Sequence, residues 1–208
     1  MAFIKKQAQP STEQTQSTPE TRDCQSLLKQ LSSSDSTERR WAARDLVECQ
    51  ECANALMQRL KIETENSVRE VILTTLTRMG DPVAIAGMVD CLRSEDAALR
   101  NEVVEAMKQL PLEVAPMMLG LLADPDPDVR IFAVNVLESL CHPEVESWLI
   151  SVITYDAHVN VCATAVDLLG EVGTSNAIEP LEQLKARFNA EPYIQFAADL
   201  ALRRINEI

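Results

Sequence analysis

One pattern recurs along most of this sequence at intervals of 30 to 33 residues. Each copy has an anchor position, which is an arginine in the clearest copies, followed by small or apolar residues three and seven positions later. The six anchors are Arg39, Arg69, Arg100, Arg130, Cys162 and Gln195. Self-similarity at a fixed period of this length predicts stacked repeats, because a single unit cannot bury its apolar surface alone.

Each copy predicts a pair of helices. Positions −1, +3, +7 and +10 relative to the anchor fall on one face of a helix, which we call the anchor helix. Most copies carry an acidic residue at position −4, where a carboxylate can cap the helix start. A second apolar helix is predicted after each of the first five anchors and once before Arg39. These second helices are expected at 23–32, 51–62, 82–93, 111–122, 143–154 and 175–187.

The fold class that follows is all-α, an α-solenoid formed as a right-handed superhelix of about six helix pairs. We expect the solenoid to cover residues 22–208. Residues 1–21 are expected to form a disordered tail, because 7–21 consist almost entirely of Gln, Ser, Thr and Pro and cannot support a core.

Three segments resemble the HEAT-like repeat named for phycobilisome lyases. The best copy is 126–137 (DPDVRIFAVNVL), and 65–80 and 169–173 also match, each with a glycine shortly after the leucine. The copies at Cys162 and Gln195 depart from the pattern by lacking arginine, as expected of repeats near the end of an array. The resemblance implies the solenoid fold. The functions that it implies are diverse, since the class includes bilin lyase subunits, adaptors and scaffolds.

The charge of the chain narrows the classes of partner. The sequence has a formal net charge of −13, and outside residues 1–33 it holds 15 basic and 29 acidic side chains. A surface this acidic repels phosphate groups, so neither nucleic acid nor an anionic membrane is expected as a partner. The first residues, MAFIKK, are too short an apolar run for a signal peptide, and a cytoplasmic location is predicted.

The six cysteines are expected to be reduced and mostly buried, because a helical core of this size needs no staples. Cys49 and Cys52 form a CxxC, for which core or turn positions are favoured and a redox role remains an alternative. The next Cys and His cluster, Cys141 and His142, is predicted to lie about 30 Å away at roughly 10 Å per helix layer. We therefore expect no metal, no cofactor and no catalytic residues.

The arginine anchors at 39, 69, 100 and 130 have two interpretations. As structural repeat anchors, Arg39, Arg69, Arg100 and Arg130 would bond acidic residues or carbonyl groups of their own or the next repeat. As an alternative, they would form an anion-binding stripe. The structural interpretation is favoured, and the resemblance supports it because this arginine belongs to the repeat signature.

The helix predicted at 111–122 is apolar almost all round. If Ala115, Leu119 and Leu122 are its buried positions, other apolar side chains lack a place in the core. The hypothesis is an exposed apolar strip with an acidic rim, for which a helix buried on both sides is the alternative. The candidate partner-binding residues are Met117, Met118, Leu121, Trp148, Val152, Glu144 and Glu179.

The function predicted from these features is that of a non-enzymatic protein–protein interaction module, an adaptor or scaffold that uses the concave helix layer. The partner is expected to be a protein with basic and apolar surface, and a hetero-oligomer is favoured over a homo-oligomer. The alternative, implied by the resemblance alone, is a bilin lyase subunit or chromophore chaperone.

One measurement distinguishes the interaction module from the bilin lyase subunit. Mixing the protein with a linear tetrapyrrole and an acceptor subunit is expected to leave the visible absorption spectrum unchanged, because no residue spacing in the chain calls for bilin chemistry. A new or shifted absorption band would instead support the lyase alternative.

Overall fold

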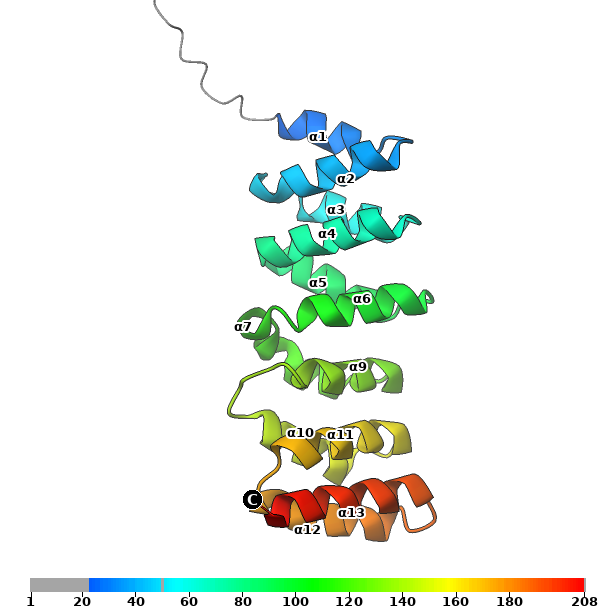
Figure 1. The fold of residues 1–208 in the computed structure, drawn as a ribbon, viewed down its shortest axis with the longest axis vertical. Coiled ribbons are helices and arrows are strands. Elements are labelled where there is room, and N and C mark those ends of the chain that lie inside the picture. The colour runs from blue at the N-terminus through cyan, green and yellow to red at the C-terminus, as the bar shows by residue number, and fades with distance from the viewer. Residues whose placement is uncertain (1–22, 50, 208) are drawn as a thin grey trace, which may run out of the picture.

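The fold is a stack of helix pairs, as seen in a computed structural model that describes residues 23–49 and 51–207 (Figure 1). This described part contains thirteen α-helices, three short 3₁₀ segments and no strand. Because α7, η2 and α8 follow one another directly, they fill one helix position, which leaves six pairs. The predicted all-α solenoid is confirmed. The tail predicted for 1–21 lies outside the described residues.

The anchor helices lie one below another along the long axis, with the second helices behind them (Figure 1). The anchor helices are α2 (Ser36–Asp45), α4 (Asn66–Met79), α6 (Ala97–Met107), α9 (Pro127–Leu137), α11 (Val159–Val172) and α13 (Pro192–Glu207). The second helices are α1 (Cys24–Gln30), α3 (Ala53–Leu60), α5 (Pro82–Cys91), α7 (Pro111–Val114) with η2 (Ala115–Met117) and α8 (Met118–Leu122), α10 (Val145–Tyr155) and α12 (Ile178–Arg187). The other 3₁₀ segments are η1 (Leu46–Glu48) and η3 (Ser175–Ala177).

The acidic residues at position −4 begin several anchor helices. Asp35, Asp96 and Asp126 are N-caps whose carboxylates accept hydrogen bonds from backbone N–H groups of the first turn. Glu65 occupies the same place without a side-chain hydrogen bond to the helix. The predicted helix starts are therefore correct, and aspartate supplies the caps.

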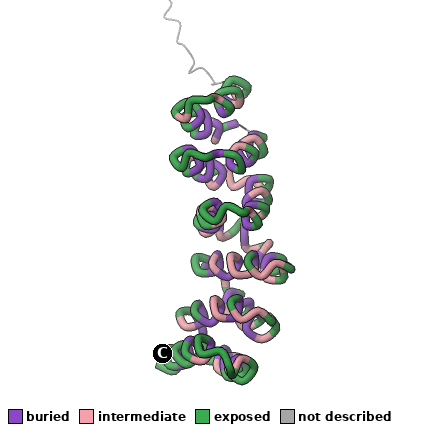
Figure 2. The backbone as a smooth tube through the Cα atoms, turned by 90° about the vertical axis from the view of Figure 1, so that its right-hand side faces the viewer, coloured by how far each residue is buried: buried purple, intermediate pink, exposed green. Residues whose placement is uncertain are grey.

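The core runs the whole length of the stack between the two layers. In α9 the positions −1, +3 and +7 are Val129, Ala133 and Leu137, and all three are buried. Buried segments recur at every level of the molecule (Figure 2). The core is thus one continuous cluster to which every helix pair contributes.

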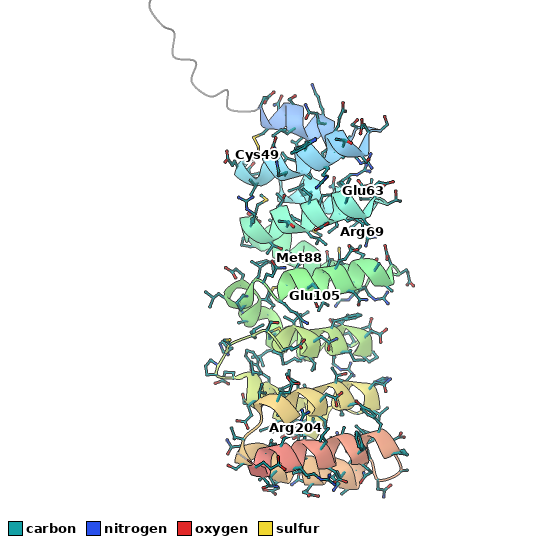
Figure 3. The ribbon with its side chains drawn as sticks, in the orientation of Figure 1. Cys49, Glu63, Arg69, Met88, Glu105 and Arg204 are labelled. Atoms are coloured by element: carbon teal, nitrogen blue, oxygen red, sulfur yellow. A yellow bond between two sulfur atoms is a disulfide. The ribbon has the colours of Figure 1, made fainter. Side chains whose placement is uncertain are left out.

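Two arginine anchors bind a carboxylate of the following repeat with both arms of the guanidinium. Arg39 donates to the two carboxylate oxygens of Glu63 at 2.8 Å each (Glu63 is labelled in Figure 3), and Arg130 donates to those of Asp156 at 2.6 and 3.0 Å. Each also donates to carbonyl oxygens of the turn before its own helix, at Ser33 and Asp124. Such an arginine joins its own turn to the next repeat.

The other two arginines use different partners. Arg69 donates to Asp96 and Glu102 of the next repeat, each at 3.0 Å. Arg100 donates to the Ser94 carbonyl at 2.6 Å and lies over the ring of Phe132, with 5.7 Å from its Cζ atom to the ring centroid. The Nε atom of Arg100 is buried without a hydrogen-bond partner in the described residues.

The two anchors that lack arginine keep the bond to the preceding turn. The Cys162 thiol lies 3.3 Å from the Asp156 carbonyl oxygen, and the Gln195 amide donates to the Lys185 and Phe188 carbonyls. Beside Cys162, Arg187 from the end of α12 supplies a guanidinium that donates to the last carbonyl groups of α10. A guanidinium from another helix therefore lies in the region where the other repeats have their anchor arginine.

The expectation that all cysteines are reduced is wrong for two of them. Cys24 and Cys49 form a disulfide, with 5.9 Å between their Cα atoms, which ties α1 to the 3₁₀ turn after α2. Cys52, the second cysteine of the CxxC, is a buried thiol whose pKa is raised by burial and by Glu51. The sequence spacing could not show this pairing, because it depends on α1 packing across η1.

Glu63 is expected to give the fold a marked acid sensitivity. Its side chain is fully buried, which by itself raises its pKa. Hydrogen bonds from Arg39, Arg59 and the Glu65 N–H lower the pKa by more than burial raises it, to about 2. Because this folded pKa lies below the ordinary value of 4.5, the stabilisation is present above pH 4.5 and is lost as the pH falls toward 2. At pH 7 we expect Glu63→Gln to lower the free energy of unfolding by about 3 kcal/mol.

Urea unfolding followed by circular dichroism at pH 7, 4.5 and 3 measures this effect. The exposed Glu70→Gln is the matched control and should change stability by less than about 0.5 kcal/mol. A Glu63→Gln protein as stable as the wild type at pH 7 would contradict the role of this ion pair.

Candidate binding groove

The structure corrects the apolar strip predicted on the fourth second helix. Met118 and Leu121 are buried and Met117 is partly buried, whereas Leu112 and Leu119 are 81% and 66% exposed. The buried positions are thus Val114, Met118 and Leu121, one residue earlier than expected. One residue corresponds to about 100° of helix rotation, which moves Leu119 from the expected buried face into solvent.

The helix whose buried positions differ from the prediction is also interrupted. Pro116 lacks an N–H group, and the chain passes through the 3₁₀ turn η2 between α7 and α8. Because apolar residues surround this segment on all sides, the sequence offered no polar face from which to fix its rotation.

A groove of about 520 Å³ lies between α8 and α10. Its lining residues are Leu119, Leu122, Ala123, Asp124, Arg130, Trp148, Ser151, Val152, Tyr155, Asp156 and Ala157. Trp148 and Val152, two of the predicted binding residues, are mostly buried but contribute to this lining. The structure therefore brings Trp148 and Val152 together with Leu119 and places Met118 and Leu121 in the core.

Aromatic rings form the α10 wall of the groove. Trp148 stacks on His142, with 4.9 Å between ring centroids and an interplanar angle of 13°. The Nδ1 atom of His142 accepts a hydrogen bond from the Glu144 N–H at 3.2 Å, which fixes the histidine ring. One turn beyond Val152, Tyr155 is 81% exposed. The wall thus combines a fixed indole with an accessible phenol ring, a pairing suited to contact with apolar side chains.

One end of the groove carries paired charges. Burial raises the pKa of Asp156, but the hydrogen bonds from Arg130 and from the His158 N–H lower it more, so its pKa lies below the ordinary value. The same ion pair raises the pKa of Arg130. Asp124, the second carboxylate of the lining, is paired with Arg93 from the end of α5.

The surroundings of the groove are acidic. Residues 110–160 contain eight carboxylates and one arginine, a net charge of −7. Arg93, Lys108 and Arg187 reach this region from neighbouring repeats and offset part of this charge. A negative field therefore surrounds the apolar walls even though the two carboxylates in the lining are paired.

The predicted acidic rim lies at other positions. Glu144 is exposed at the start of α10, where its Oε2 atom accepts a hydrogen bond from Ser147, and Glu179 is exposed on α12. Neither lines the groove. Sequence reasoning missed Leu119, Tyr155, Asp124 and Asp156. A signal existed for Tyr155, which follows Trp148 at a spacing of seven and therefore shares its helix face.

Across residues 23–49 and 51–207, no three His, Cys, Asp or Glu side chains lie close enough together to hold a metal ion. None of the helices in the described part is long and apolar enough to cross a membrane.

Comparison with known families agrees with the architecture. A family model of HEAT repeats matches residues 24–108 and 114–205, which is most of the sequence. The chain therefore belongs to the HEAT-repeat family. The interval between the two matched stretches falls at the start of α7, the irregular second helix. No curated protein matches the sequence significantly.

Several solved structures are similar to this chain in their fold alone. A computationally designed armadillo repeat protein for modular peptide recognition is 18% identical, with a TM-score of 0.44, and the match covers 88% of this chain and 100% of that one. An engineered protein is 21% identical, with a TM-score of 0.43 and coverage of 89% and 99%. The complex of CpcE and CpcF of phycocyanin lyase from Nostoc sp. PCC7120 is 18% identical, with a TM-score of 0.37 and coverage of 92% and 98%.

The rotation of this helix about its axis, as the structure has it, predicts that two adjacent residues differ sharply in their contribution to stability. Met118→Ala removes a fully buried side chain and should lower the free energy of unfolding by about 2–5 kcal/mol. Leu119→Ala shortens an exposed one and should change it by less than about 0.5 kcal/mol. Urea denaturation of the two variants measures the difference. Equal losses for both would mean that the phase is wrong.

Proposed function

We propose that this chain is an adaptor or scaffold that binds a protein segment in the groove between α8 and α10. One observation carries the proposal: Leu119 and Tyr155 present apolar surface beside the largely buried Trp148, along a groove whose surroundings are acidic. Apolar side chains that become buried in a contact supply most of its binding energy. The negative electrostatic field around the groove selects and orients the partner.

The chemistry of the partner follows from the groove. A volume of about 520 Å³ accommodates a few side chains rather than a domain. The segment that fits best presents aromatic or branched apolar residues next to lysine or arginine. Basic side chains gain from the net negative charge around the groove, whereas an acidic segment is repelled. Its binding is therefore expected to weaken with added salt.

Selection from a displayed library of random peptides tests the proposal on the full chain. We expect selected peptides to combine apolar residues with lysine or arginine and to bind about tenfold or more weakly to the double variant Leu119→Asp/Tyr155→Asp. The matched control is Ile62→Asp, which introduces the same side chain at an exposed apolar position after α3. Peptides that bind the double variant as tightly as the wild type would place the binding surface elsewhere.

A further inference from the structure

The last helix carries an apolar stripe where the other anchor helices are solvated. Tyr193, Phe196 and Leu200 follow one another at helical spacing on α13, and Phe196 and Leu200 are 66% and 40% exposed. The Tyr193 hydroxyl donates to Asp167 of α11 at 2.8 Å, which leaves its ring at the edge of the stripe. Packing inside the solenoid does not require these apolar side chains.

Comparison of equal positions within the molecule shows how unusual this stripe is. Leu200 stands five residues after its anchor. The same position in the five preceding anchor helices is polar, with Arg44, Thr74, Glu105, Asn135 and Asp167. Phe196 stands one residue after its anchor, where the first three helices carry the polar residues Arg40, Glu70 and Asn101 and the next two carry Ile131 and Ala163. Since the position of Leu200 is polar in every preceding anchor helix, and Phe196 beside it is 66% exposed, the apolar stripe indicates a contact outside the repeat stack.

The stripe has charged neighbours of both signs. Asp199 and Arg203 are exposed along one edge of α13, four residues apart, and Asp199 also binds Lys185 of α12 at 2.6 Å. Arg204 (labelled in Figure 3) lies on the side of α11, with its guanidinium close to Gly170. When two copies of this helix are placed antiparallel with Leu200 at the centre, Asp199 of each lies near Arg203 of the other, and Phe196 lies near Arg204. The stripe is thus complementary to itself in both apolarity and charge.

From this self-complementarity we infer that two copies of this chain associate through α13, antiparallel about a two-fold axis near Leu200. The helix has 16 residues and is therefore about 24 Å long, so the contact buries less than the roughly 1,200–2,000 Å² of a stable interface. The dimer is a weak one, with a dissociation constant on the order of 10–100 μM. The groove between α8 and α10 stays free, and the dimer presents two such grooves.

Sedimentation velocity over a range of protein concentrations tests the dimer. All proteins carry Cys141→Ser, because this exposed free thiol could link copies covalently. The wild-type surface should show a concentration-dependent dimer, and Phe196→Glu/Leu200→Glu should shift its midpoint at least tenfold to higher concentration. The matched control is Asn101→Glu/Asn135→Glu, which introduces the same charge at the same two repeat positions and should dimerise normally. A monomer at all concentrations, or a dimer unaffected by Phe196→Glu/Leu200→Glu, would overturn the inference.

A charge-exchange experiment tests the pairing itself and does not depend on the apolar variants folding. Asp199→Arg alone and Arg203→Asp alone place like charges across the two-fold axis, so each should dimerise less than the wild type. An equimolar mixture restores opposite charges at both pairs and should recover the dimer as a mixed species. A mixture that stays as monomeric as its components would refute the antiparallel arrangement. Neither experiment involves the groove, so the outcome is independent of the function proposed above.

Discussion

Each helix pair of this solenoid has apolar surface on both sides along the stack and can bury it only against its neighbours. The single cluster of buried side chains, which extends from α1 to α13, is the consequence. Stability in such an array is a sum over repeats and the joints between them. An interaction that fixes one repeat on the next therefore matters more here than in a globular core.

The arginine anchors act at these joints. Arg39 and Arg130 each bind a carboxylate of the following repeat and a carbonyl of their own turn, so a single side chain holds two segments of backbone in place. Arg100 has no such carboxylate and relies on the Phe132 ring, although its Nε atom stays without a partner in the described residues. At the joint between α6 and α9 the anchor itself makes no ion pair, and Lys108 with Glu138 and Arg93 with Asp124 supply the ion pairs there. The irregular helix of α7, η2 and α8 lies in the same repeat, next to the groove.

The first and last helices of the stack differ in the side chains that they expose. At the first end, α1 is a short helix with a mostly polar exposed surface, and its disulfide to Cys49 holds it in place. At the other end, α13 is long and well packed on α11 but presents Phe196 and Leu200 to solvent. The outer surface of α1 is therefore polar, whereas α13 exposes apolar side chains.

The sequence by itself determined the period of the repeat, the helix pairs, the positions of the anchors and the acidity of the surface. These features are local or additive, since helix periodicity and net charge need no knowledge of neighbours. Only the tertiary structure decided the rotation of the helix around Met118, the pairing of Cys24 with Cys49 and the meeting of Leu119 with Trp148. Each of these depends on which surface a neighbouring helix covers. Where a segment is apolar on all sides, its sequence leaves that choice open.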